Sequence, residues 1–112
     1  MALYKLKGKM IYLANATNTN YYKIGFSDNI KKRIKSLQTG CPTKLKIIIT
    51  HHGCRKKEEK IQEIFKNYKV RENTEWFEFS NYKVLKKVIN EIKKNYFDNT
   101  EKEQKYFYSM ID

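Results

Sequence analysis

The sequence predicts a small α/β domain of the α+β type, in which a mainly antiparallel three-stranded sheet is flanked by helices. Two alternating apolar segments joined by a short polar turn predict a β-hairpin near the start of the chain. Segments with helix and strand periodicity then follow one another in turn. With 112 residues, the chain has the size of one domain with one modest core.

The predicted hairpin joins a strand over residues 9–15 to a strand over residues 21–26 through a Thr-Asn-Thr-Asn turn. Successive side chains of a strand point to opposite faces of the sheet. Tyr12 is therefore expected on the face opposite to that of Ile11 and Leu13.

Gly25 lies inside the second predicted strand, which indicates a bulge or the close approach of another group to the backbone. The residues at 27–29, Ser-Asp-Asn, are typical of helix caps. We expect a helix over residues 29–38, which Gly40 ends and Pro42 cannot continue. Three apolar side chains recur at helical spacing in this segment: Ile30, Ile34 and Leu37.

A third strand is predicted over residues 44–52, with Leu45, Ile47 and Ile49 on one face. A second helix is predicted from about residue 55 to residue 68, because its apolar side chains form a stripe at helical spacing. The stripe consists of Ile61, Ile64, Phe65 and Tyr68.

The last segments are a short extended stretch over residues 75–79 and a third helix that begins at Ser80 or Asn81. This helix is expected to end near residue 96, so that residues 1–96 form a single domain. Residues 97–112 are expected to be a C-terminal tail or a short helix that docks on the core.

The charge of the chain points to a polyanionic partner. It contains 24 Lys and Arg residues against 12 Asp and Glu residues, for a formal net charge of +12. A basic surface of this kind most often binds nucleic acid, here expected to be DNA. Only Arg33, Arg55 and Arg71 are arginines, and an A/T-rich codon bias could also account for much of the lysine.

We expect an intracellular protein with no membrane partner. No apolar run approaches the roughly 20 residues that span a bilayer, and the N-terminus lacks the features of a secretory signal. Cys41 and Cys54 are then expected to be reduced thiols. With His51 and His52 they could in principle bind zinc, but they lack the paired spacing of structural zinc sites, so no zinc is expected.

The first predicted helix carries the charged residues of greatest interest. On a helical wheel, Arg33 falls at the border of the apolar stripe, whereas Lys31, Lys32 and Lys35 fall on the open face. Arg33 at this border favours an anionic partner, although its stem could also lie over the core rim with its head in water. The three lysines, with the backbone at Gly25, are our candidates for nucleic-acid contacts.

These features together resemble the GIY-YIG nuclease superfamily, and in particular a subgroup found in phages, large DNA viruses and some bacteria. The first signature reads Met10-Ile11-Tyr12 and the second Lys23-Ile24-Gly25. Arg33, the stretch Leu37-Gln38-Thr39-Gly40 and the triplet Glu75-Trp76-Phe77 follow in the same order. The resemblance covers about residues 9–80 and implies the GIY-YIG-like fold.

The chain also departs from the pattern at three positions. Met10 replaces the Gly of the first motif, and Lys23 replaces the Tyr of the second. On the second helix, Glu58 matches the subgroup, but Gln62 stands where its members often have His.

The resemblance implies a DNA endonuclease or nickase that hydrolyses phosphodiester bonds with Mg²⁺ (or Mn²⁺). Glu75 would be the metal ligand, because Mg²⁺ prefers carboxylate oxygen. Arg33 would bind the scissile phosphate, and Tyr12 would take a proton from the attacking water. Because a phenol has an ordinary pKa near 10, the ammonium of Lys23 would have to assist Tyr12.

Two other functions stay open at this level. The chain could be a catalytically inactive module of the same fold that binds nucleic acid or protein. It could also be an accessory protein whose charge reflects codon bias. If the chain is a nuclease, such a small module has little surface for sequence readout, so weak specificity, a homodimer or dependence on a partner protein would follow.

Overall fold

The computed structural model describes residues 7–94, which form four strands, three α-helices and one short 3₁₀ helix. The predicted tail or docking helix over residues 97–112 lies outside the described residues. The elements, in chain order, are β1 Lys7–Ala16, β2 Tyr21–Asn29, α1 Ile30–Thr39, β3 Leu45–His52, α2 Arg55–Ile64, the 3₁₀ helix η2 Lys66–Tyr68, β4 Trp76–Glu78 and α3 Tyr82–Lys93.

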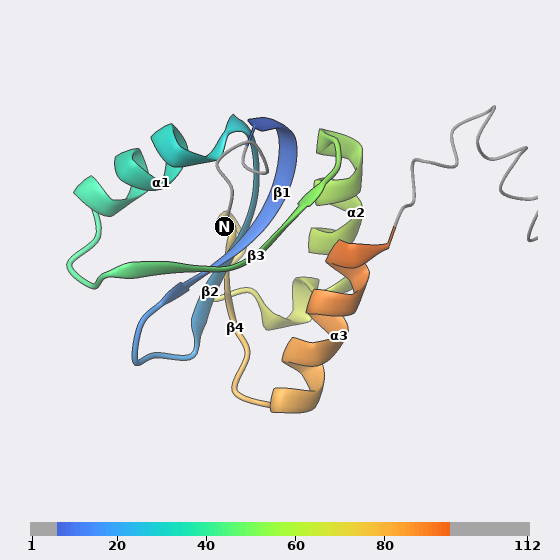
Figure 1. The fold of residues 1–112 in the computed structure, drawn as a ribbon. Helices are drawn as coiled ribbons and strands as arrows, with labels where there is room; N and C mark the ends of the chain where they lie inside the picture. The colour runs from blue at the N-terminus through green and yellow to red at the C-terminus, as the bar shows by residue number, and fades with distance from the viewer. Residues whose placement is uncertain (1–6, 95–112) are drawn as a thin grey trace, which may run out of the picture.

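The strands form one antiparallel sheet in the order β3-β1-β2-β4. The α+β prediction is confirmed, but the sheet has four strands rather than three, because the short extended segment near residue 77 pairs with β2. Helix α1 covers one face, and α2 and α3 cover the other (Figure 1). None of the described helices has the length and apolar character needed to cross a bilayer.

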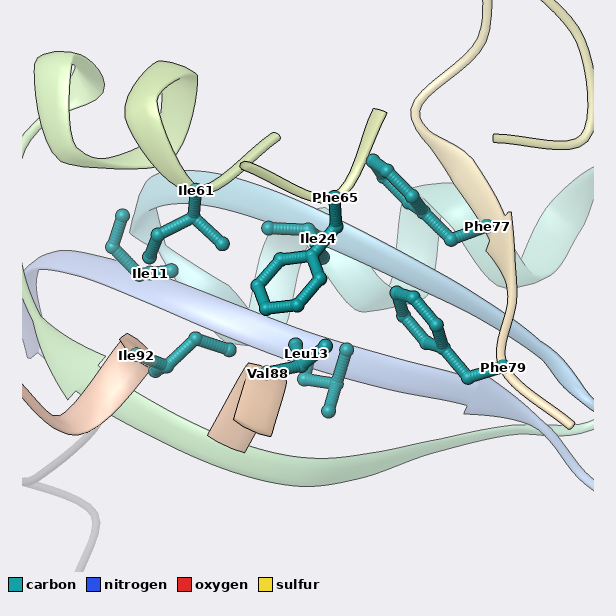
Figure 2. Packing of buried hydrophobic residues seen from close by; sticks show 9 residues of the cluster. All are labelled: Ile11, Leu13, Ile24, Ile61, Phe65, Phe77, Phe79, Val88 and Ile92. Atoms are coloured by element: carbon teal, nitrogen blue, oxygen red, sulfur yellow. The ribbon is translucent and has the colours of Figure 1, made fainter. Parts of the chain in front are cut away.

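The larger core lies between the sheet and helices α2 and α3. Ile11 and Leu13 of β1 and Ile24 of β2 point to this side and are fully buried. Figure 2 shows them against the side chains that cover them, Ile61, Phe65, Phe77, Phe79, Val88 and Ile92.

A smaller core lies under α1 on the opposite face. Met10, Tyr12 and Ala14 of β1 are buried there together with Ile30 at the start of α1. The predicted alternation along β1 is therefore confirmed, with Tyr12 on the side opposite to Ile11.

The alternation predicted for the third strand is wrong at its centre. The pairing of β1 with β3 shifts register, since Leu13 faces Ile49 while its neighbour Ala14 faces Ile47. Such an irregularity inserts one residue, here the exposed Ile48, and changes the faces of the residues on either side. Ile47 consequently packs under α1, whereas Ile49 packs in the larger core.

Two predicted boundaries also differ from the structure. Ser27 and Asp28 belong to β2 rather than to a helix cap, because β1 begins at Lys7 and pairs as far as Asn29. Asn29 still caps α1, and its side chain accepts a hydrogen bond from the Lys32 amide.

The second helix ends at Ile64 rather than at residue 68. The chain continues as η2, which brings Phe65 and Tyr68 against the ring of Phe79. Tertiary contacts between aromatic rings thus interrupt a segment whose spacing suited a continuous helix. Ile64, predicted in the apolar stripe, is 47% exposed as a result.

The ammonium of Lys57 joins three elements inside the protein. Lys57 is fully buried on α2, and its Nζ donates hydrogen bonds to the backbone carbonyls of His52, Ile92 and Lys94. The carbonyls at the end of a helix have no partner within the helix, so a lysine there satisfies them and favours the helix dipole. The hydrogen bonds of Lys57 therefore connect the C-terminal end of α3 to β3 and α2.

Replacing this lysine should destabilise the domain. We expect Lys57→Met to lower the free energy of unfolding by about 1.5–3 kcal/mol, because charge-assisted hydrogen bonds to buried carbonyls are lost. Urea denaturation followed by circular dichroism measures the change. Lys56→Met, at an exposed position of the same helix turn, is the matched control and should change stability by less than about 0.5 kcal/mol. Equal effects of the two variants would contradict the role of Lys57.

Candidate active site

The pairing between β2 and β4 ends early and leaves part of the β2 edge to other groups. Only residues 21–23 of β2 pair with β4. Beyond them, the Ile24 amide donates to the Glu75 carbonyl over 3.4 Å, and the Ile24 carbonyl accepts from Nε2 of Gln62 over 2.9 Å. Helix α2 and the segment before β4 therefore meet β2 at the same place.

An ion pair between Lys23 and Glu75 lies at this place. Lys23 Nζ is 2.5 Å from Glu75 Oε1. Lys23 is only 7% exposed, whereas the side chain of Glu75 is 45% exposed. A buried ammonium needs an anionic partner, and Glu75 provides it. In the structure the ammonium of Lys23 contacts Glu75, and its expected assistance to Tyr12 stays a prediction.

Tyr12 and Gly25 face each other across the β1–β2 pair. A Cβ atom at position 25 would overlap the phenol ring and hydroxyl of Tyr12. The predicted close approach at Gly25 is confirmed, and the approaching group is Tyr12. Because Gly25 is buried under the ring, the structure assigns it this role rather than the expected nucleic-acid contact.

The hydroxyl of Tyr12 is buried, and among the described residues no group meets the distance and angle criteria for a hydrogen bond to it. Burial raises the pKa of Tyr12 to about 12. The guanidinium of Arg33 lowers this pKa through its charge and as a nearby donor, while the carboxylates of Glu75 and Glu58 raise it. Tyr12 is thus a neutral phenol at neutral pH, and its pKa is shifted away from the value that a base would need.

Arg33 extends from α1 towards the buried phenol and is itself exposed to solvent. It lines a polar hollow of about 250 Å³ at the start of α1, together with Lys32, Ser36 and the acidic side chain of Asp28. Its exposure agrees with a stem that lies over the core rim and a head in water, and an anionic partner for Arg33 stays a prediction. An exposed guanidinium in such a hollow is suited to bind a phosphate.

The three lysines predicted to bind nucleic acid divide into two groups. All three are exposed, and Lys32 shares the polar hollow with Arg33. Lys31 and Lys35 instead line an apolar groove of about 630 Å³ between α1 and β3. Only Lys32 therefore lies beside Arg33.

Glu58 is a second carboxylate near this site. The sequence analysis named it only as a residue that matches the family pattern. It is buried, and it accepts hydrogen bonds from Gln62 over 3.3 Å and from Arg55 over 3.4 Å. Burial, and then the charge of Glu75, raises the pKa of Glu58 above its usual range. Its position one helical turn before the buried Ile61 is the sequence signal that could have identified it.

The donors at this site suit a hard cation better than zinc. Within residues 7–94, no three His, Cys, Asp or Glu side chains are grouped so that they could hold a metal. Glu75 keeps nearly half of its side chain exposed. One or two carboxylates completed by water and phosphate oxygens are the usual environment of Mg²⁺. The residues present therefore fit Mg²⁺ or Mn²⁺.

His51 of the third strand lies on the face of the sheet opposite to Tyr12. His51 pairs with Ile11 of β1, whose side chain belongs to the larger core, and its Nδ1 is 3.4 Å from the ammonium of Lys57. Cys54 is the residue before α2, and Cys41 lies in the loop after α1.

Comparison with known proteins matches one family model to nearly all of the described region. The model described as the T5orf172 domain matches residues 9–93. No curated protein and no solved structure shows significant similarity to the chain.

Removing the buried hydroxyl should not weaken the fold. We expect Tyr12→Phe to keep the free energy of unfolding or raise it by up to about 1–3 kcal/mol, because an unsatisfied buried polar group is removed. Tyr12→Ala, which also empties the space above Gly25, should instead cost about 3–5 kcal/mol. Denaturant titration measures both. A clear loss of stability in Tyr12→Phe would show that the hydroxyl has a partner.

Neutralising Glu58 should stabilise the fold in a pH-dependent way. The raised pKa means that the folded state favours the protonated carboxyl, so this contribution is present below the ordinary pKa and is lost as the pH rises through the folded-state pKa. We therefore expect Glu58→Gln to raise the melting temperature at pH 7, with a smaller gain near pH 4. Glu59→Gln, at an exposed neighbour, is the control. A gain that grows towards acid pH would refute the assignment.

Proposed function

We infer that this chain, which belongs to the T5orf172 domain family, is a metal-dependent DNA endonuclease or nickase. The family is phage-associated and related to nuclease-like folds, which supports a nuclease-like or DNA-binding class. The resemblance to GIY-YIG nucleases supports the more specific proposal of phosphodiester hydrolysis.

The observation that carries the proposal is the convergence of four side chains from distant segments. Tyr12 comes from β1, Lys23 from β2, Arg33 from α1 and Glu75 from the segment before β4. Lys23 contacts Glu75 directly. The charge of Arg33 lowers the pKa of the Tyr12 phenol, and the charge of Glu75 raises it. A phenol, a guanidinium and a carboxylate at one place are the groups needed to hold a proton, a phosphate and a cation.

Arg33 is proposed to bind the scissile phosphate. Its exposed guanidinium can donate two parallel hydrogen bonds to non-bridging oxygens. The same donors would stabilise the additional negative charge of the transition state. Lys32, in the same hollow, would add attraction for the flanking backbone phosphates.

Glu75 is proposed to hold Mg²⁺ or Mn²⁺, with Glu58 as the nearest further carboxylate. When bound, the cation would supply Lewis-acid stabilisation of the charge that develops on the phosphate and the leaving oxygen. Its approach requires Glu75 to turn at least one oxygen away from Lys23, which the exposure of the carboxylate permits.

Tyr12 begins as a neutral phenol and is proposed to become a base only when the charges around it change. Glu75 raises the pKa of Tyr12, so compensation of the Glu75 charge removes one of the causes of the shift. An ammonium of Lys23 freed from Glu75 would then favour the phenolate on the same face of the sheet. In this proposal Lys23 and Tyr12 are coupled through Glu75.

A catalytically inactive binding module is the second candidate. The observations that favour it are the closed ion pair of Lys23 with Glu75 and the complete burial of Tyr12. Such a module would hold DNA through the basic surface without cleaving it.

Nicking of supercoiled plasmid distinguishes the two. With Mg²⁺ or Mn²⁺, we expect the wild-type protein to nick the plasmid, and Arg33→Ala and Glu75→Gln to slow nicking by about 100-fold or more. Lys86→Ala, which removes an exposed positive charge on α3, is the control for net charge and should stay within a few-fold of wild type. Plasmid binding without cleavage in either metal would favour the binding module.

A further inference from the structure

A hollow next to the Lys23–Glu75 pair has no role in the proposed reaction. It measures about 350 Å³ and lies between the β1–β2 turn, the loop after α1 and the segment before β4. We call it the Trp76 hollow. The lining side chains that bear on its chemistry are Tyr21, Trp76 and Arg71.

The Trp76 hollow borders the candidate active site through the strand pairing. Trp76 follows Glu75 in the chain and is paired with Lys23, so the two side chains share a face of the sheet. Tyr21 lies two residues before Lys23 on that face.

The lining is suited to a flat aromatic ligand. Trp76 is half-buried, Tyr21 is 43% exposed, and Arg71 is exposed. Indole and phenol rings stack on nucleobases regardless of sequence, and a guanidinium can add a cation–π contact. A volume of about 350 Å³ is at the small end of the usual range of about 300–1,000 Å³ for ligand pockets.

The other hollows described for residues 7–94 differ in this respect. The groove between α1 and β3 and the polar hollow around Arg33 have no aromatic side chain in their lining. The Trp76 hollow is therefore the one among them in which aromatic faces and a guanidinium lie together.

We propose that the Trp76 hollow binds an unpaired nucleobase of the strand whose phosphate lies at the candidate active site. A base inside a duplex is stacked and paired, so it must be extruded or already single-stranded to enter such a hollow. The preferred substrate is therefore single-stranded or locally unpaired DNA. This inference rests on the proposed function for the position of the phosphate but concerns a separate surface.

The protein carries its own reporter for this hollow, since Trp76 is the sole tryptophan of the chain. Intrinsic fluorescence is recorded while the wild-type protein is titrated, in EDTA to prevent cleavage, with a 12-nucleotide oligo-dT. A matched oligomer with the same backbone and abasic sites at every position is the comparison. We expect quenching by oligo-dT, and little quenching with weaker binding for the abasic oligomer.

Variants test whether the neighbouring side chains take part. Tyr21→Ala should weaken oligo-dT binding about 5- to 150-fold, in line with about 1–3 kcal/mol for one stacked base. Arg71→Ala should weaken it in the same direction. Tyr82→Ala, at a tyrosine that is 72% exposed on α3, is the matched control and should bind like wild type. Circular dichroism of each variant checks the fold.

Three results would overturn the inference. Equal affinity and quenching for the abasic oligomer would show that only backbone phosphates are bound. Equal quenching by a blunt duplex of the same length would refute the unpaired base, and unchanged affinity in Tyr21→Ala would remove the stacking partner. Loss of plasmid nicking with base-dependent quenching intact would count against the nuclease proposal alone, so the two proposals fail separately.

Discussion

The candidate site depends on the early end of the pairing between β2 and β4. A strand edge must have its amide and carbonyl groups satisfied, and β4 satisfies this edge only as far as Lys23. The next groups, at Ile24, are satisfied by the Gln62 side chain and the Glu75 backbone. The early end of β4 therefore leaves the β2 edge beside Lys23 open to α2 and to the segment that carries Glu75.

Burial determines the chemistry of the groups collected there. The ammonium of Lys23 lies inside the sheet in contact with Glu75, and Tyr12 is held neutral because its hydroxyl is buried near two carboxylates. Arg33 alone among the four candidates is exposed enough to meet a substrate without rearrangement. In the proposed reaction, compensating the charge of Glu75 would release Lys23 from its partner and would lower the pKa of Tyr12.

Much of the fold could be predicted because its signals are local. Patterns within a few residues predict the hairpin, the start of α1 at an Asn cap and the two faces of β1. The structure has all three features. The faces of the third strand could not be predicted, since the irregularity at Ile48 arises from register with β1. Helix α2 stops early for a similar reason, because Phe65 packs on Phe79 from a distant segment.

The sequence by itself determined the elements, their order, the approach of some group to Gly25 and which residues were candidates for a shared site. The tertiary structure alone decided that the approaching group is Tyr12, that Lys23 binds Glu75 rather than Tyr12, and that Glu58 adjoins them. The physical reason is the distance along the chain over which each interaction acts. Periodicity and helix caps depend on residues a few positions apart. Burial and ion pairing depend on residues from distant segments, which become neighbours only in the folded protein.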